Sequence, residues 1–443
     1  MKPYRVSPRW YLFPQSFFRG HRSRSYHLRV DNLARKLHST RSSVSGGGNG
    51  NGEGSFFLVP GATVATLLML GFLHARRLYE EKKVDDVKEK GIELEFSPDV
   101  KAAFLRLLPL RSISRFWGYL TSLEIPIWLR PSIYKAWARA FHADLEEAAL
   151  PLEEYATLQD FFIRSLKSGS RPIDLDSNCL VSPVDGTVLR FGELRGPGAL
   201  IEQVKGFSYS AYSLLGATTS LHEIVDMDAP PEEHSEHRFT EEPHKTSWLR
   251  ISLASPKIRH PISACPRKGV FYCVLYLHPG DYHRVHSPVD WQVLLRRHFS
   301  GRLLPLNQRA TRTIRNLHIE NERVILEGRW REGFMAMVAI GATNIGSIKL
   351  YIEPELKTNR PKRQLLHTEP PDEKIYEPVG IGLMIKKGEE VAAFNLGSTV
   401  VLVFQAPILG SSEQYATPSD FKFCIRNGDR VKAGEAIGSW SGS

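Results

Sequence analysis

From residue 171 onward, the sequence alternates short apolar runs with glycine and proline turns, and this alternation restricts the fold more than any other feature. The runs are rich in β-branched residues and include 180–184, 270–277, 323–326, 334–340, 348–352, 391–394 and 399–404. Runs of this length between turn residues are typical of strands, whereas a helix needs a longer stretch with apolar residues three or four apart. We therefore expect residues 171–443 to form a mainly β body.

Three segments of this body share a tight glycine turn, at 182–188, 385–391 and 427–435. These turns are similar to those of lipoyl- and biotinyl-type barrel-sandwich domains, which favours a compact sandwich. Residues 219–262 interrupt the pattern with a stretch rich in proline and glutamate, and we expect an inserted loop there. The loop contains five histidines, but their spacing matches no metal-site motif, so we predict no metal. They are His222, His234, His237, His244 and His260.

Residues 95–168 carry the apolar spacing of helices, with Ile113, Phe116 and Leu120 as an example. Thr157 and Asp160 have the spacing of a capping box, and Pro131 suits a first helical turn. Large apolar side chains between arginines are typical of helices that lie on a membrane surface, although each helix could equally pack on its own domain. The whole chain is thus expected to be α+β.

The formal net charge of +10 is concentrated at the amino terminus. Residues 1–52 contain ten basic residues and one acidic residue, so about +9 of the charge lies there. A segment rich in arginine and serine and poor in acids is typical of an organelle transit peptide that ends in a glycine-rich linker. The alternative is a disordered basic tail that binds RNA or anionic lipid. Because the rest of the chain is almost neutral, we expect no nucleic-acid partner.

Residues 56–73 form an uncharged run of 18 residues. Its length is at the lower limit for crossing a bilayer, so we predict a single transmembrane helix, with a buried core helix as the alternative. If the organelle is the mitochondrion, the basic segment before residues 56–73 favours an amino terminus in the matrix and a body on the other side of the inner membrane. The four cysteines form no C-x-x-C pair, which argues against a disulfide scaffold or a zinc ribbon.

Three places in the β body carry residues suited to catalysis. Asp185 lies in a turn before glycine, where it could equally cap the backbone. His283 and His286 follow an apolar run and lie beside an aspartate and an arginine, a cluster that suits acid–base chemistry or a structural role. Gly397 and Ser398 interrupt an apolar strand, which indicates either a bulge or a nucleophile beside a strained peptide.

Together these places resemble one family, the phosphatidylserine decarboxylases. Residues 396–399 are similar to its self-processing L-G-S-T motif, residues 281–288 to its D-Y-H-R-x-H-x-P motif, and residues 182–186 to its S-P-x-D-G turn. The segments 203–206, 214–216 and 341–348 also resemble family segments. The similarity runs in order over roughly residues 100–443, and only the stretch 219–262 departs from the compact bacterial pattern. With the transit peptide and the span, the chain resembles the mitochondrial inner-membrane type.

The resemblance implies that Ser398 Oγ attacks the Gly397 carbonyl and converts the peptide bond into an ester. Loss of the Ser398 α-proton eliminates the upstream chain, and hydrolysis of the resulting dehydroalanine releases ammonia and leaves a pyruvoyl group. His286 is implied as the base and Asp185 as the group that orients it. The products are a large chain, 1–397, and a small chain, 398–443.

The resemblance further implies that phosphatidylserine in the membrane is the substrate and that its amine forms a Schiff base with the pyruvoyl carbonyl. Carbon dioxide leaves, and hydrolysis releases phosphatidylethanolamine. His283 is implied as the acid that returns the proton and positions the carboxylate. Lys205 or Arg284 as a ligand of the lipid phosphate is a hypothesis. No metal, pyridoxal phosphate or nucleotide is required.

Other functions stay open at this point. A pyruvoyl enzyme could act on a soluble amine precursor, although the span and the apolar helices favour a lipid. A membrane-tethered Ser-His-Asp hydrolase, or a non-catalytic carrier or scaffold built on a barrel-sandwich domain, would each remain one intact chain. We expect the catalytic body to face the intermembrane space, and association into a homo-oligomer is left open.

Overall fold

The computed structural model describes residues 96, 105–195, 198–216, 268–344, 347–361, 370–395, 398–408 and 420–440. The predicted transit peptide (1–52), membrane span (56–73) and inserted loop (219–262) lie outside these residues. Among the helices that the structure does describe, none is long and apolar enough to cross a membrane.

The first described elements are helical and lie within the predicted segment 95–168. They are α4 (Leu110–Thr121), the 3-10 turn η1 (Ile127–Leu129), α5 (Arg130–Phe141), the 3-10 turn η2 (Leu152–Glu154) and α6 (Leu158–Phe162). Pro131 occupies the first turn of α5, and Thr157 forms the predicted capping box with Asp160 at the start of α6. These helices pack around an aromatic core of their own that includes Trp117, Tyr134 and Phe161.

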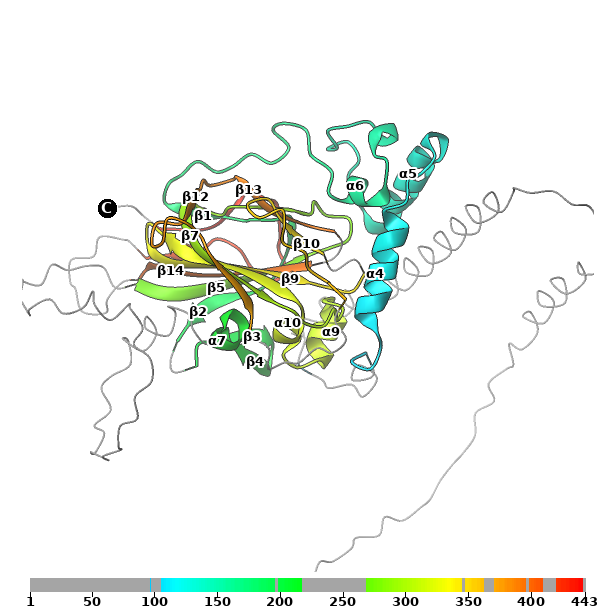
Figure 1. Ribbon diagram of the computed structural model, residues 1–443. Coiled ribbons are helices and arrows are strands. Elements are labelled where there is room, and N and C mark those ends of the chain that lie inside the picture. The colour runs from blue at the N-terminus through cyan, green and yellow to red at the C-terminus, as the bar shows by residue number, and fades with distance from the viewer. Residues whose placement is uncertain are drawn as a thin grey trace, which may run out of the picture. The chain divides into compact units, whose positions relative to one another are not determined.

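The body is built around a nine-stranded antiparallel sheet in the order β11-β7-β8-β9-β14-β5-β2-β16, with β12 also beside β7 (Figure 1). Its strands are β2 (Gly186–Leu194), β5 (Lys268–Leu277), β7 (Trp291–Phe299), β8 (Arg323–Trp330), β9 (Gly333–Gly341), β11 (Asp372–Ile375), β12 (Leu383–Ile385), β14 (Ser398–Pro407) and β16 (Arg430–Val431). The prediction of a mainly β body with a few helices is confirmed.

Among the described residues, the body also contains two three-stranded sheets and a hairpin. One sheet joins β1 (Cys179–Val181), β17 (Ala436–Ser439) and β15 (Lys422–Phe423), and the other joins β10 (Ile348–Leu350), β13 (Glu390–Phe394) and β6 (Arg284–His286). The hairpin is β3 (Leu200–Val204) with β4 (Phe207–Ser210), accompanied by α7 (Ala211–Leu215), α9 (Gln308–Thr313) and α10 (Leu317–Glu320). The run predicted over 180–184 ends early as a strand, because Pro183 lacks the N–H that a ladder needs.

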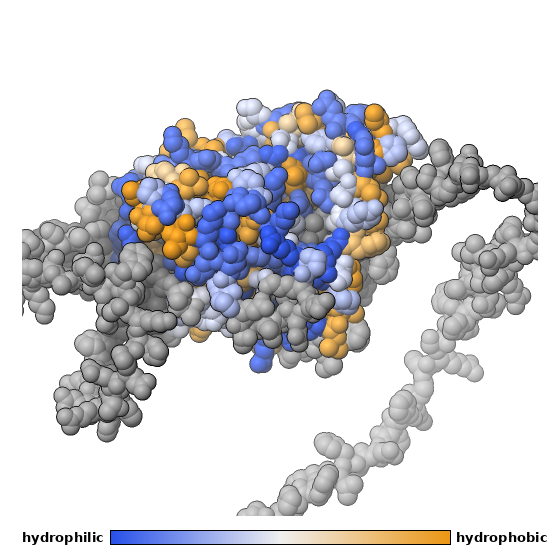
Figure 2. Space-filling view, viewed as in Figure 1, coloured by the Kyte–Doolittle hydropathy of each residue, from blue (hydrophilic) through white to orange (hydrophobic). Residues whose placement is uncertain are grey.

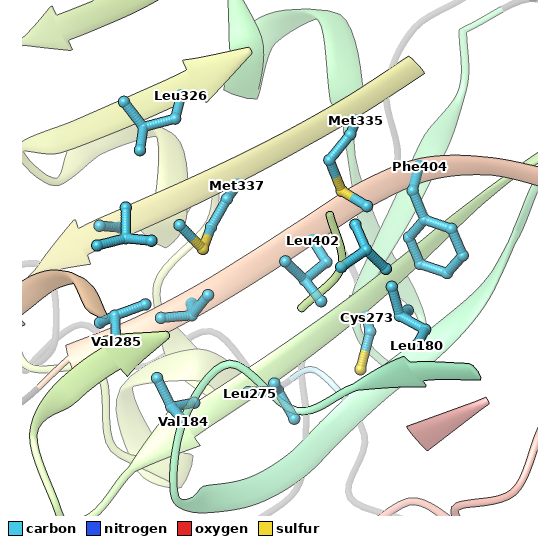
Figure 3. Close-up of a cluster of buried hydrophobic side chains, with 14 of the residues drawn as sticks. Leu180, Val184, Cys273, Leu275, Val285, Leu326, Met335, Met337, Leu402 and Phe404 are labelled. Carbon is cyan, nitrogen blue, oxygen red and sulfur yellow. The ribbon is translucent and has the colours of Figure 1, made fainter. Parts of the chain in front are cut away.

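The strand β14 has apolar side chains on both faces because the sheet is covered on both sides. Val400, Leu402 and Phe404 enter one large core together with Val285 and Met337, and Figure 3 shows part of this cluster. The alternate residues of β14 enter a second core beneath β3, α7 and α9; they are Val401 and Val403. Burial on both faces explains why this strand reads as a continuous apolar run instead of an alternating one.

Candidate active site

Ser398 is the first residue of β14 and lies between two neighbouring strands. It is paired with Leu277 of β5 on one side and with Gly341 of β9 on the other. The period of two along the strand places its side chain on the same face as Val400, toward the larger core. Ser398 is fully buried, and its Oγ has no hydrogen-bond partner in the part of the chain that the structure describes. Gly397, the other half of the predicted cleavage site, lies outside the described residues.

A tight turn follows β5 and carries the histidine cluster. The Asp281 N–H donates to the His278 carbonyl (2.9 Å), and the Asp281 carboxylate accepts the His278 N–H (2.7 Å). Gly280 is required at the tip, because a Cβ there would lie 2.0 Å from the carbonyl oxygen of Phe141 in α5. The turn at residues 278–281 is thus held by its own hydrogen bonds and by close packing against α5.

His283 is completely buried after this turn, with its ring 4.0 Å from that of Phe162 in α6. Its Nδ1 lies 2.7 Å from the Asp281 carbonyl oxygen, and a carbonyl only accepts, so Nδ1 carries the proton. Burial lowers the pKa of His283 to about 3, which keeps the ring neutral. Its Nε2 therefore presents a lone pair, and that atom has no partner among the described residues.

His286, in β6, is also neutral but its ring is fully engaged. Its Nδ1 donates to the Gly388 carbonyl (2.9 Å), and its Nε2 accepts from the Tyr282 hydroxyl (3.1 Å). Burial lowers the pKa of His286; the bond to the Gly388 carbonyl, the negative charge of Glu390 and, to a smaller extent, that of Asp185 oppose this shift. Side chains alternate along a strand, and Val285 of β6 points into the larger core. The side chain of His286 therefore projects from the other face of β6.

Asp185 lies in the turn before β2, buried and held by a forked arginine. Arg171 donates to it through Nε (2.8 Å) and Nη2 (2.5 Å), and the Ala433 N–H adds a third bond (2.9 Å). These bonds keep the carboxylate close enough for its charge to act on His286. Within the described residues, however, Asp185, His286 and Ser398 are not joined by direct hydrogen bonds, so the roles assigned to them stay predictions.

The two candidates for binding a lipid phosphate differ in their surroundings. Arg284 uses its guanidinium to bind the Ile163 carbonyl (3.0 Å), the Ser165 hydroxyl (2.7 Å) and the Glu390 carboxylate (2.8 Å). It is thus a cross-link between the helical segment and the body. Lys205 lies exposed in the turn between β3 and β4. No cluster of three potential metal ligands occurs in the described residues.

Sequence reasoning missed Arg171 and Arg164. Arg171 lies at the start of the predicted β body, and its contact with Asp185 depends on how the chain folds back after α6. Arg164 is buried beside the turn, with Nη2 3.3 Å from the Gly280 carbonyl and its guanidinium over the Phe161 ring. Neither residue belongs to a motif that spacing alone would single out.

Comparison with known proteins completes the description of the site. A family model described as phosphatidylserine decarboxylase matches residues 158–439. A protein of Arabidopsis thaliana named phosphatidylserine decarboxylase proenzyme 1, mitochondrial, is 58% identical over 434 residues, covering 96% of this chain and 95% of its own. The protein of the same name from Oryza sativa subsp. japonica is 62% identical over 411 residues, covering 91% and 94%. The mitochondrial proenzyme of Pongo abelii is 34% identical over 375 residues, covering 82% and 80%.

Proposed function

The chain belongs to the phosphatidylserine decarboxylase family, and on that premise we propose that its pyruvoyl group is made from Ser398 by self-cleavage between Gly397 and Ser398. The enzyme converts phosphatidylserine into phosphatidylethanolamine, a step of phospholipid biosynthesis, and uses a covalent pyruvoyl group. As a proenzyme of this family, it gives two chains from one precursor, and like its relatives it is mitochondrial.

The buried Ser398 hydroxyl is the observation that carries this assignment. Buried hydroxyls in folded proteins almost always have a partner, and leaving one unpaired costs about 1–3 kcal/mol. The described residues around Ser398 provide none. They fit a pyruvoyl group at this position, because a keto group removes the donor that the fold leaves unpaired. When formed, that group supplies a carbonyl that accepts the electrons released with carbon dioxide.

For the cleavage, we assign the removal of the Ser398 hydroxyl proton to His286, supported by Asp185. The neutral ring of His286 has its lone pair on Nε2, as a base requires, and the Asp185 charge favours the protonated ring that results. Nε2 accepts from the Tyr282 hydroxyl in the structure, so proton transfer from Ser398 requires that contact to be exchanged. The new ester bond joins Ser398 Oγ to the Gly397 carbonyl carbon as the peptide C–N bond breaks.

For the decarboxylation, we assign proton transfer and positioning of the substrate carboxylate to His283. Its Nε2 is buried and unpartnered in the described part of the chain, while Nδ1 is fixed by the Asp281 carbonyl. Because burial lowers the pKa of His283 to about 3, Nε2 can take up and return a proton only where the negative charge of the substrate carboxylate offsets that effect of burial. Burial beside Phe162 also excludes water from the ring.

We place the enzyme in the inner membrane, with residues 56–73 as a single span and the body facing the intermembrane space. The exposed apolar side chains of α4 and η1 support a second contact with the bilayer, through which the lipid head group reaches the body. Phe116, Tyr119 and Trp128 are more than half exposed there (62%, 63% and 78%). Aromatic side chains of this kind are enriched where protein meets the lipid–water interface.

The test is the chain composition of the purified protein, by denaturing gel and intact mass. Wild-type protein should give chains that end at Gly397 and begin at residue 398, the second with a blocked amino terminus. Ser398→Ala should give one inactive chain, and His286→Ala should also block cleavage. His283→Ala should cleave at least partly but decarboxylate poorly.

Each alternative gives a different result in the same experiment. Two chains from Ser398→Ala would overturn the assignment of the nucleophile, and full activity of His283→Ala would remove its assigned role. A wild-type protein that stays intact while it hydrolyses esters would indicate a Ser-His-Asp hydrolase. An intact protein without activity would indicate a carrier or scaffold.

A further inference from the structure

The strand β16 brings a cation from the carboxyl-terminal part of the chain onto the histidine turn. Arg430 is paired through its backbone with Thr187 of β2, and its Nη2 donates to the Asp281 carboxylate at 2.5 Å. The arginine side chain is 59% exposed, whereas that of Asp281 is 7% exposed. The contact therefore joins a surface cation to a buried anion.

Asp281 connects this cation to His283, because its carboxylate binds Arg430 and its backbone carbonyl binds the His283 ring. One carboxylate oxygen accepts from Arg430, and the other accepts the N–H of His278. The backbone carbonyl of Asp281 holds Nδ1 of the His283 ring at 2.7 Å. Because the carboxylate is bonded on both sides, movement of Asp281 is restrained, and the carbonyl that sets the orientation and tautomer of His283 is restrained with it.

We propose that Arg430 is a positioning residue for decarboxylation, which acts from the small chain through Asp281 to hold His283. This inference rests on the proposed function in two respects: His283 acts in decarboxylation, and the chain is cut before residue 398. After the cut, Arg430 and Asp281 belong to different chains, so each chain supplies part of what fixes the histidine.

The charges around Asp281 predict how the pair responds to pH. Burial raises the pKa of Asp281, the charge of Asp185 also raises it, and Arg430 and the His278 N–H lower it. Removing the cation should therefore raise the pKa of Asp281 further. A protonated Asp281 loses its charge-assisted bonds, so activity should begin to fall at a higher pH when the solution is acidified.

The experiment uses the full chain after self-cleavage and compares R430Q, R430K and R426Q. R426Q makes the same change of charge in the same small chain at an exposed arginine whose side chain has no bond in the described residues. For R430Q we expect normal cleavage, a kcat lower by roughly threefold to tenfold, and an unchanged KM. In a plot of kcat against pH, the fall in kcat on the acid side (the acid limb) should move to higher pH. R430K should recover most of the kcat, and R426Q should match the wild type.

A second measurement needs no variant. Because Arg430 is more than half exposed, salt should screen the pair, so added KCl should move the acid limb of the wild-type enzyme to higher pH but leave that of R430Q in place. The inference is overturned if R430Q matches R426Q in kcat and acid limb, if R430K is as impaired as R430Q, or if the wild-type limb ignores salt. Cleavage on the gel tests the proposed function separately. The proposed cleavage and the proposed role of Arg430 can therefore be contradicted independently.

Discussion

At the scale of single residues, the site depends on buried charges that are matched in pairs. In the proposed cleavage, the buried carboxylate of Asp185 supports His286. Arg171 holds this carboxylate with two N–H groups. Burial lowers the pKa of the guanidinium, but the hydrogen bonds and charges of its acidic partners raise it overall. A buried ion pair adds little net stability, but loss of one partner leaves an uncompensated charge.

Replacement of Arg171 should show how much depends on this pair. Arg171→Ala should reduce the free energy of unfolding by about 3 kcal/mol and slow self-cleavage, because Asp185 then keeps only the Ala433 N–H. Arg171→Lys should be intermediate, since an ammonium cannot reproduce the fork. Denaturant unfolding and a cleavage time course on gels measure both effects. Arg195→Ala, which removes an arginine with an 82% exposed side chain, is the matched control, and an equal effect there would contradict the prediction.

A second residue-scale prediction concerns histidines that the fold keeps neutral. Burial lowers the pKa of His318 to about 4, against an ordinary value near 6.5, and the ring bonds the Tyr209 hydroxyl at 2.9 Å. Between these two pH values the unfolded chain binds more protons, so the contribution of His318 is complete above pH 6.5 and is lost as the pH falls toward 4. At pH 5 the loss amounts to about 2 kcal/mol.

His318→Gln should thus be less stable than the wild type at pH 7, but its Tm should fall less steeply between pH 7 and pH 5. Thermal unfolding at a series of pH values provides the comparison. His318 lies in α10 and bonds Tyr209 of β4, neither of which carries a residue assigned to catalysis, so the mutant should still cleave. Parallel Tm curves for the two proteins would show that His318 does not titrate as described.

At the scale of elements, α4 has two different faces. One face is anchored: Arg111 donates to the Gly301 carbonyl and to the Glu322 carboxylate of the body, and Trp117 is buried in the aromatic core of the helices. The other face exposes apolar side chains, and Figure 2 shows them gathered along the helix. They are Ile113, Phe116 and Tyr119, at helical spacing, together with Leu123 just beyond the end of the helix. An apolar face on a helix that is already anchored to its domain needs another surface to cover it.

If that surface is the lipid bilayer, Phe116→Asp should impair delivery of the substrate but leave the chemistry intact. Moving a phenylalanine side chain into an apolar region is worth about 2 kcal/mol, so KM for phosphatidylserine in vesicles should rise at least about tenfold. Cleavage and kcat should stay unchanged, and the difference should shrink with detergent-dispersed lipid. Ser208→Asp adds the same charge on β4 and serves as the control; an equal KM in both variants would argue against membrane contact by α4.

The elements also show what could be predicted from the sequence. The strands β5, β8, β9 and β14 contain the predicted runs because their β-branched residues are packed on both faces, and this is a local signal. The short strand β6 and the turn before it depend on contacts with the end of α5 and with Ile163 and Arg164 just after α6, more than 100 residues earlier in the chain. Ser398, His283 and Asp185 were found through motifs, whereas Arg171 and Arg430 act through tertiary contacts that no motif records.

At the scale of the whole molecule, the proposed cleavage would create a complex of two chains. The strand that begins at Ser398 lies inside the nine-stranded sheet, paired over Ser398–Pro407 with β5 and over Ser398–Phe404 with β9. Later parts of the same segment, β16 and β17, pair with β2 and β1, and Phe404, Phe421 and Trp440 enter the larger core. Departure of the small chain would expose edges of the four strands that it pairs with, β5, β9, β2 and β1, and much of this core.

The small chain should therefore remain bound after cleavage and should leave only when the body unfolds. In size-exclusion chromatography under native conditions, both chains should elute together at every dilution, and in urea both should lose structure in one transition. The midpoint of that transition should rise with protein concentration, because unfolding now separates two molecules. The uncleaved Ser398→Ala protein supplies the control, since its midpoint should not depend on concentration. Elution of the small chain alone from native protein would show that the sheet does not hold the two products together.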